Sequence, residues 1–265
     1  MQVHSINKGY NSKPNFKSWS REVTTRSFLG DKIIKHRNDS WFFRDAEFWP
    51  IFTEYLVERF KNVPKVNVYS YGCSDGSEPF SFVMRMLSAH PKESSKFLPV
   101  IAKDYDKEAI NKVEKREYYT IKGLEKNDID FCTNKSFNRF FNIIDSGPAM
   151  SFAFAKDELY DNVQFSVADI RSDYKKIEPN NSVVFVRNFW PYIENWSDRQ
   201  KLLKKLGDQL GENSFLVIGF FDRKATCWTI DNQVIEAGFK RTLVDFVFEK
   251  DCSKNFADKK VDVCK

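Results

Sequence analysis

The chain has 265 residues, 42% of them hydrophobic and 30% charged, which suits one large packed domain and excludes a wholly disordered chain. Basic residues number 42 against 37 acidic ones, and the interleaved signs form no basic stripe of the kind nucleic acid requires. Five cysteines without a Cys-x-x-Cys pair favour neither a disulfide framework nor a zinc site. No signal segment or membrane-length apolar run is present, so we expect a cytoplasmic protein without membrane insertion.

The N-terminal part of the chain contains a polar segment followed by an amphipathic one. Residues 1–40 are polar and predict an extended arm or a short helical cap. Asp45–Lys61 has apolar residues at helical spacing and predicts an amphipathic helix, which ends before Pro64. We therefore expect an N-terminal arm and helix over residues 1–61, followed by a second domain over 62–265.

From Pro64 onward, short apolar runs alternate with helical patterns, as in a parallel sheet with helical crossovers. The predicted strands are Val66–Tyr71, Phe97–Lys103, Val163–Val167, Ser182–Arg187, Ser214–Phe221 and one or two strands within Phe239–Lys250. The predicted helices are Glu78–His90, Asp106–Arg116, Ser197–Leu210 and Ile230–Ala237. Ser197 is expected to cap its helix, with Gln200 at capping-box spacing. The fold class is therefore α/β, with a doubly wound, mostly parallel, Rossmann-like sheet.

One stretch departs from this alternation. Tyr118–Asn162 contains helical and aromatic pieces but no clear strand–helix–strand unit. It predicts a small inserted subdomain, over about residues 118–162, that packs beside the sheet.

The turn after the first predicted strand carries glycines and carboxylates together. Gly72 and Gly76 permit a tight turn and a close approach of backbone to a ligand. Asp75 and Glu78 suit a cationic ligand better than a pyrophosphate, and S-adenosylmethionine offers a cationic amino group and a sulfonium. An acidic turn that only caps the next helix is an equally open interpretation at this point.

Polar residues also follow the later strands, where ligands of doubly wound sheets bind. Asp104 is placed to bond ribose hydroxyls, while Asp106 is expected to cap the next helix. Asp169 could accept a hydrogen bond from an adenine amino group. Arg187 and Asn188 close an apolar strand and are expected to lie at the cleft rather than in the core.

Four segments in this order resemble the CheR-type family of chemoreceptor glutamate O-methyltransferases, from about Ser40 to the last strand. The segments are Ser40-Trp41-Phe42-Phe43-Arg44 (family T-x-F-F-R), Tyr69–Ser81 (an acidic glycine loop ending G-E-E-P-Y-S), Ala102–Asp106 (A-T-D-I-D) and Arg187–Tyr192 (R-N-x-x-x-Y). Four motifs in order at plausible spacing are far more specific than any one of them. The resemblance implies the class I methyltransferase fold, with S-adenosylmethionine as cofactor and S-adenosylhomocysteine as product.

The resemblance also implies roles for individual residues. Glu78 would bind the cofactor's amino group, Asp104 its ribose, and Asp169 would lie near its adenine. The implied cofactor-binding set is Gly72, Ser74, Glu78, Asp104, Asp169 and Asn188. The residues expected to line the methyl-transfer cleft and place the acceptor carboxylate are Arg44, Arg187 and Tyr192.

The implied reaction is methyl transfer to a protein glutamate carboxylate, on a partner such as a chemoreceptor-like helical protein. A glutamate, with a pKa of roughly 4.3, is already ionised at neutral pH, so no general base is needed. The chain also departs from the family: Ser77 replaces the first Glu of the E-E-P motif, Phe80 stands where Tyr is common, Pro191 lies inside the R-N-x-x-x-Y loop, and only about forty residues precede Phe42. A reduced N-terminal helical domain is therefore expected, and with it a different engagement of the acceptor.

Two alternatives remain. An N-methyltransferase acting on nucleic acid or a protein amine is suggested by Asn188–Tyr192, which is one residue longer than an N-P-P-Y loop. A module that binds S-adenosylmethionine without catalysis is the other. Alkali-labile methyl label would identify the carboxylate enzyme, whereas salt-sensitive retention on heparin would favour a nucleic-acid substrate.

Overall fold

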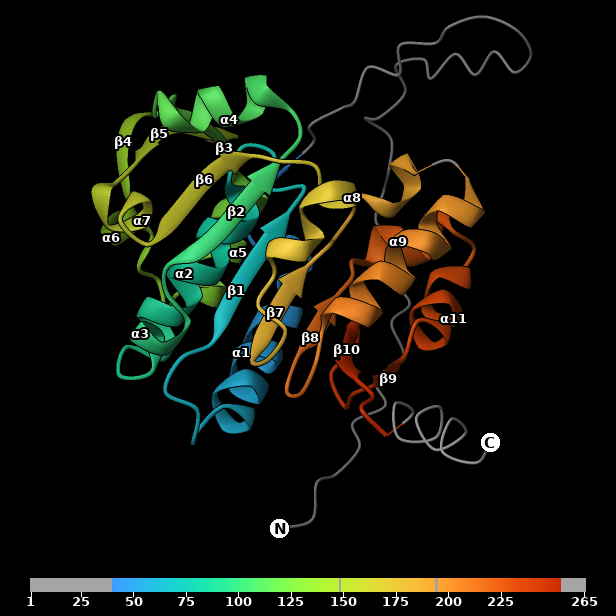
Figure 1. Ribbon diagram of the computed structural model, residues 1–265. Coiled ribbons are helices and arrows are strands. Elements are labelled where there is room, and N and C mark those ends of the chain that lie inside the picture. Colours follow the sequence, from blue (N-terminus) through green and yellow to red (C-terminus); the bar gives the residue numbers. More distant parts are fainter. Residues whose placement is uncertain (1–39, 148, 194, 254–265) are drawn as a thin grey trace, which may run out of the picture. The chain divides into compact units, whose positions relative to one another are not determined.

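The computed structural model describes residues 40–147, 149–193 and 195–253 (Figure 1). The expectations for residues 1–39 lie outside these ranges. All described residues belong to one compact unit. In the described part of the chain, no helix has both the length and the apolar character needed to cross a membrane.

A seven-stranded sheet forms the centre of the described unit, with the order β6-β2-β1-β7-β8-β10-β9. The strands are β1 Asn67–Tyr71, β2 Val100–Asp104, β6 Val163–Val167, β7 Ser182–Phe185, β8 Phe215–Val217, β9 Phe239–Arg241 and β10 Val247–Lys250. The first five run parallel to one another, and β10 runs antiparallel to both β8 and β9. This arrangement confirms the predicted doubly wound, mostly parallel α/β fold.

Helices cover both faces of the sheet (Figure 1). They are α1 Phe48–Arg59, α2 Ser77–Ala89, α3 Ser94–Phe97, α4 Lys107–Glu114, α8 Ile170–Asp173, α9 Trp196–Gln209, α10 Phe220–Ala225 and α11 Thr229–Glu236. Two short 3₁₀ turns, η1 Tyr174–Lys176 and η2 Trp190–Tyr192, lie in the loops.

The two faces of the sheet build two separate cores, because successive strand side chains point to opposite faces. Val68 and Val183 pack into the core that contains α1, α2 and α4. Tyr69 and Val184, the next residues along, pack into the core that contains α8, α9 and α11. A strand buried on both faces reads as a continuous apolar run, which is why β7 was recognisable in the sequence.

The segment predicted as an insertion contains a second, three-stranded antiparallel sheet with the order β3-β5-β4. Its elements are β3 Tyr119–Lys122, α5 Gly123–Cys132, α6 Phe137–Phe140, β4 Phe141–Ser146, β5 Met150–Ala155 and α7 Asp157–Tyr160. The strands were not predicted individually, because their apolar residues do not alternate cleanly. Ile143 and Ile144 are both exposed, and the β4–β5 register is irregular between Ile143 and Asp145.

Two local predictions were wrong. The run Ser214–Phe221 is not one strand, because β8 ends at Val217 and α10 begins at Phe220. Ser197 is not the cap of α9, since Asn195 holds that position and its side chain accepts the Ser197 N–H at 2.9 Å. The Asn195 side-chain oxygen accepts the N–H two residues further on, the usual N-cap bond, so α9 begins at Trp196 rather than after Ser197.

Candidate functional site

The order of the strands places the candidate site. The chain runs outward from β1 to β2 and β6, and then returns to the other side of β1 with β7. Ligands of such sheets bind outside the carboxyl ends of the strands at this reversal. The loops after β1 and β7 are in contact there, because a Cβ atom at Gly72 would lie 3.5 Å from the Cβ of Phe189.

The glycine loop after β1 has a backbone that only glycine adopts without strain. Gly72 has φ +73° and Gly76 has φ +84°, and a Cβ at Gly76 would meet the Phe165 ring at 3.0 Å. Asp75 accepts hydrogen bonds from the Ser77 N–H at 3.0 Å and the Ser77 hydroxyl at 2.7 Å. Ser77, where the family has Glu, therefore fixes the loop carboxylate beside it.

Glu78 lies in the first turn of α2 and faces the start of the loop after β7. It accepts a hydrogen bond from the Ser70 hydroxyl at 2.9 Å, and Arg187 approaches its other oxygen at 3.4 Å. Burial raises the pKa of Glu78, while the Arg187 cation lowers it. A second cationic partner would stabilise the ionised carboxylate further.

Asp104, the last residue of β2, is buried and held by backbone donors. The N–H groups of Ser74 and Asp106 each donate to it at 2.8 Å. Burial raises the pKa of Asp104, and these two bonds oppose the shift. Asp106 caps α4 as predicted, accepting the N–H groups of Glu108 and Ala109. Asp104 thus links the glycine loop to the end of the neighbouring strand.

Arg187 is buried, contrary to the expectation that it would lie open at the cleft. Its side chain is only 1% exposed, and it pairs with Asp45 at 2.8 Å and Glu78 at 3.4 Å. It also donates to the Arg44 carbonyl at 3.2 Å. Two carboxylates make burial of this cation tolerable, and the pairing joins the Ser40–Arg44 segment to α2.

Arg44 and Tyr192 are closer to the surface than Arg187. The Arg44 guanidinium stacks over the Trp41 ring at 3.5 Å from its centroid. Burial and the neighbouring Arg187 lower the pKa of Arg44, whereas Asp45, Glu78 and Tyr192 raise it. Tyr192 is 41% exposed and lies in η2. The predicted transfer residues Arg44, Arg187 and Tyr192 therefore form one electrostatic group.

Asp169 follows β6, as predicted, and has a strong local partner. Its side chain accepts the Arg171 N–H at 2.9 Å and pairs with the Arg171 guanidinium through both oxygens. These bonds lower the pKa of Asp169 and fix it as the cap of α8. It lies one residue beyond Ala168, whose N–H donates to the Asp104 carbonyl at 2.8 Å.

Asp222 of α10 is a site residue that the sequence did not reveal. Its buried carboxylate accepts the N–H groups of Asn188 at 2.7 Å, Trp190 at 3.2 Å and Gly219 at 2.7 Å. Burial raises the pKa of Asp222 to about 7, although these three donors act in the opposite direction. Asn188 has φ +62°, and Asp222 braces the turn that holds it there.

The inserted subdomain also contributes to the site. Glu125 accepts the Phe42 N–H at 2.7 Å, and burial raises the pKa of Glu125 to about 7. The Tyr119 hydroxyl donates to the Asp75 carbonyl at 2.7 Å. The subdomain therefore clamps both the segment that carries Arg44 and the glycine loop. A carboxylate and a tyrosine in an irregular segment gave no sequence signal for this role.

Three predicted site residues have buried polar atoms that could serve a ligand. Within the described chain, the Ser74 hydroxyl, the Arg187 Nε and the Asn188 Oδ1 have no hydrogen-bond partner. Buried polar atoms without partners are uncommon in folded proteins. Together with Glu78 and Asp104, they provide both donors and acceptors beside the glycine loop. This set fits the amino acid and ribose parts of S-adenosylmethionine.

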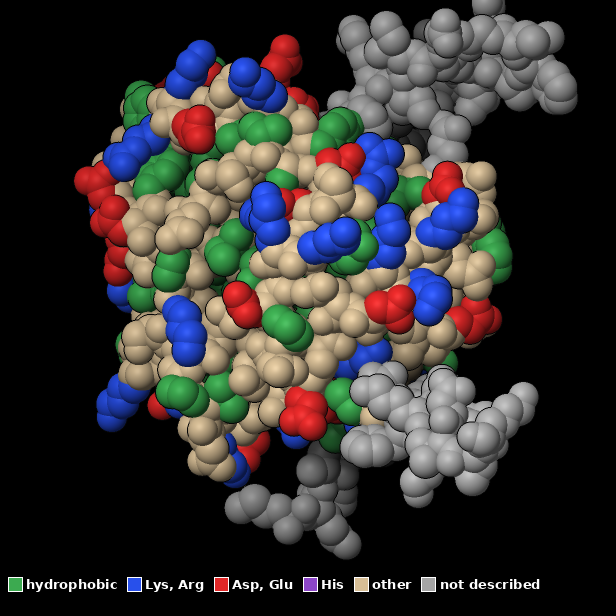
Figure 2. All heavy atoms as spheres, viewed as in Figure 1, with side chains coloured by type: hydrophobic (Ala, Val, Ile, Leu, Met, Phe, Trp, Pro, Cys, Tyr) green, Lys and Arg blue, Asp and Glu red, His purple; other side chains and the backbone are tan. Residues whose placement is uncertain are grey.

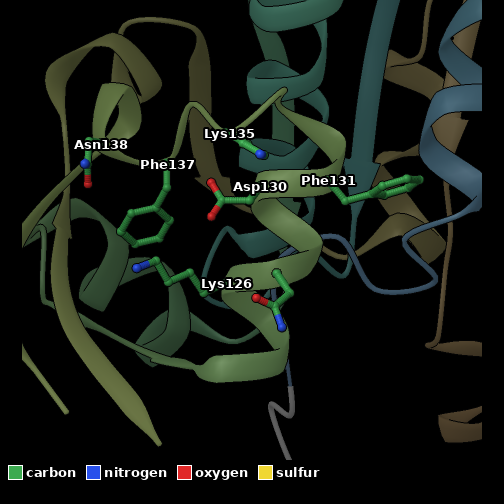
Figure 3. A pocket seen from close by; sticks show the side chains of 7 residues that line it. Lys126, Asp130, Phe131, Lys135, Phe137 and Asn138 are labelled. Carbon is green, nitrogen blue, oxygen red and sulfur yellow. The ribbon is translucent and has the colours of Figure 1, made fainter. Parts of the chain in front are cut away.

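A hollow of about 430 Å³ lies elsewhere, on α5 and α6 of the inserted subdomain (Figure 3). In Figure 3 the Asp130 and Lys135 side chains lie near each other, whereas Phe131 points away from Phe137. None of its lining residues is among the predicted site residues that follow the strands of the large sheet, so we assign the hollow no part in methyl transfer.

Comparison with known proteins agrees with the geometry. Residues 38–225 match the family described as CheR methyltransferase, SAM binding domain. Chemotaxis protein methyltransferase 2 of Vibrio cholerae serotype O1 is 24% identical over 187 residues, which cover 69% of this chain and 61% of that protein. The match thus spans about three fifths of the relative's length.

Solved structures with similar folds are more distant. The N-methyltransferase NodS from Bradyrhizobium japonicum WM9 has 11% identity and a TM-score of 0.39, covering 78% of this chain and 98% of that one. An S-adenosylmethionine-dependent methyltransferase from Clostridium acetobutylicum ATCC 824 has 15% identity and a TM-score of 0.35, covering 66% and 50%. The family match covers well over half of the chain: it belongs to the CheR methyltransferase family, and S-adenosylmethionine is its cofactor.

Proposed function

We propose that this methyltransferase transfers its methyl group to a glutamate carboxylate on a protein. The observation that carries the proposal is Arg44, a cation stacked on Trp41 beside the Arg187–Glu78 pair. A guanidinium presents parallel donors that match a carboxylate. Arg44 would therefore bind and orient the acceptor carboxylate, with Tyr192 beside it.

The same proposal gives each strand end a part in holding the cofactor. Glu78 binds its amino group and Asp104 its ribose, while Asp169 accepts from its adenine. Gly72 allows close approach of the backbone, and the unbonded side-chain oxygens of Ser74 and Asn188 accept its remaining donors. Arg187 acts through Glu78 and through the segment that carries Arg44.

The proposed reaction requires no acid or base from the chain. When bound, S-adenosylmethionine would supply a methyl group on a cationic sulfur: an acceptor oxygen would bond to the methyl carbon in line with the carbon–sulfur bond, which would break so that S-adenosylhomocysteine leaves. An ionised carboxylate carries that oxygen without losing a proton, so no side chain has to act as a base. Among the described residues the one histidine, His90, lies at the far end of α2 and bonds Thr53. The residues of the site then work by orienting the acceptor carboxylate and by excluding water.

Transfer to nucleic acid is the weaker candidate. Lys and Arg side chains gather around α8 and the adjoining part of α9 on the face shown in Figure 2. Several of them are neutralised: Arg171 by Asp169, and Lys103 and Lys176 by Asp173. A phosphate backbone would have to displace these carboxylates, which reduces the gain from binding.

We also propose that residues 62–265 form the catalytic domain, with an inserted subdomain at about 118–162, and that α1 of the N-terminal part over 1–61 packs into the same core. The acceptor would be a protein with an accessible carboxylate, of which a chemoreceptor-like helical protein is one case. The name of the Vibrio cholerae relative supports this class of partner.

A labelling experiment tests the reaction. The protein is incubated with methyl-tritiated S-adenosylmethionine and a lysate of its own source, and the labelled proteins are treated with mild alkali. Release of the label as methanol is expected for a carboxyl ester. Label that survives alkali would show an amine acceptor, and Arg44→Ala serves as the variant that should lose the ester signal.

A further inference from the structure

Apolar side chains gather on the surface formed by α10, the start of α11 and the turn between β9 and β10. Phe220 is 45% exposed and Trp228 is 58% exposed, and their ring centroids lie 6.4 Å apart. The Phe246 ring lies 6.4 Å from Phe220, and Leu243 in the same turn is 99% exposed. We call these four residues the aromatic patch. Contiguous apolar surface of this kind marks binding sites.

The backbone at Trp228 has an unfavourable conformation. Cys227 and Trp228 are consecutive residues with φ +51° and +66°, in the left-handed region that side chains disfavour. Neither is Gly or Asn, the residues that usually relieve such a conformation. Strained backbone of this kind is retained mainly at functional positions.

The aromatic patch adjoins the methyl-transfer residues. Phe220 directly follows Gly219, where a Cβ atom would lie 2.3 Å from the Asn188 Oδ1. Asp222, two residues further on, holds the Asn188 and Trp190 N–H groups, and η2 ends at Tyr192. A single short helix therefore joins the exposed rings to the turn of the site.

The charges around the patch favour an apolar partner. Two cations and two anions pair with one another beneath the rings: Arg223 with Asp231 and Asp245, and Arg241 with Asp231. Aromatic platforms that stack nucleic-acid bases lie in positively charged grooves. Here the charges cancel, so the rings offer contact area to apolar side chains and no attraction to a polyanion.

We propose that the aromatic patch docks the methyl-acceptor protein through apolar side chains that flank its accepting carboxylate. The inference rests on the proposed function, since an acceptor that brings a carboxylate to Arg44 and Tyr192 must also cover the surface next to them. A few residues supply most of the binding energy of an interface, and Trp is among the types enriched at those positions.

Two fluorescent peptides test the proposal, each of about 13 residues with one central Glu. One peptide carries Leu three and four residues to either side of the Glu, and the other carries Ser there. Binding is measured by anisotropy on the full chain saturated with S-adenosylhomocysteine. The wild type should bind the Leu peptide about tenfold more tightly than the Ser peptide, as expected for one aromatic anchor.

Matched variants locate the effect. Trp228→Asn, which tolerates the left-handed backbone, and Phe220→Gln should each remove most of the preference for Leu and leave the affinity for S-adenosylhomocysteine unchanged. Phe131→Ala is the control, because Phe131 is also 58% exposed but lies on α5. The control should keep the preference.

Several results would overturn the proposal. Equal or absent binding of the two peptides refutes it, as does a preference that both patch variants retain. Self-association that depends on Trp228, measured by sedimentation velocity, would make a second copy the occupant. Alkali-labile methylation of the peptides is followed in parallel. A Leu preference without methylation of the peptides upholds the docking surface and refutes the carboxylate reaction. Methylation of the peptides without a Leu preference upholds the carboxylate reaction and refutes the docking surface.

Discussion

Replacing Asp222 by Asn should change the pH dependence of stability in a defined direction. Oδ2 of Asp222 accepts two N–H groups at 2.7 Å, whereas Oδ1 accepts one at 3.2 Å. The amide oxygen of Asn can keep the two short bonds and turn its NH₂ group toward the weaker donor. The new amide would thus mimic the protonated carboxyl group, and we expect Asp222→Asn to cost at most about 1 kcal/mol near pH 5.5.

The pKa of Asp222 is about 7 in the folded chain and near 3.8 when unfolded. Since the folded value is the higher one, the stability that the protonated form gives is complete below about pH 4 and is lost as pH rises toward 7. Between about pH 5.5 and 7 this loss amounts to roughly 2 kcal/mol, at 1.36 kcal/mol for each pH unit. The Asp222→Asn variant should not lose this stability, because its amide does not ionise.

Denaturant unfolding of both proteins at about pH 5.5 and 8.5 checks the difference. Between about pH 5.5 and 8.5 the difference in the free energy of unfolding between Asp222→Asn and the wild type should shift by about 2 kcal/mol in favour of the variant. Glu125→Gln serves as a second case, because burial also raises the pKa of Glu125 to about 7. If Asp222→Asn instead loses stability relative to the wild type at high pH, the three N–H donors outweigh burial and the reasoning fails.

Four further substitutions test the site. Glu78→Gln should weaken S-adenosylhomocysteine binding about tenfold in calorimetry, because it removes the carboxylate proposed for the amino group, and an unchanged Kd would reject that role. Arg44→Ala and Tyr192→Phe should lower methyl transfer at least tenfold with little change in cofactor Kd; equal losses in both would move these residues to the cofactor side. Gly219→Ala should weaken cofactor binding, because the new Cβ would lie 2.3 Å from Asn188 Oδ1, and normal affinity would show that this turn can shift freely.

The sheet was predictable where burial on both faces leaves an uninterrupted apolar run. Ser182–Arg187 is such a run and extends β7 by two residues; the edge strand Val163–Val167, which is mostly exposed, was also predicted, with its observed limits. The same rule failed at Ser214–Phe221, where the apolar run continues into α10 although Phe220 and Phe221 face solvent. Composition alone does not distinguish an exposed docking residue from a core residue.

The strand-end residues were found because the topology brings loops that are far apart in sequence to one edge. Glu78 and Arg187 lie 109 residues apart and form an ion pair. The residues that brace the site were missed for a physical reason. Asp222 and Glu125 accept backbone N–H groups 34 and 83 residues away, at Asn188 and Phe42. Since every residue other than proline has such a donor, no residue type in the sequence indicates these bonds.

A crystal structure with S-adenosylhomocysteine bound tests the central claim most directly, namely that the loops after β1, β2 and β7 form the cofactor site. The amino group of the ligand should lie within hydrogen-bond distance of Glu78, and its ribose hydroxyls should lie on Asp104. The Ser74 hydroxyl and Asn188 Oδ1 should gain partners. A ligand bound away from these loops, with Glu78 still joined only to Ser70 and Arg187, would contradict the account.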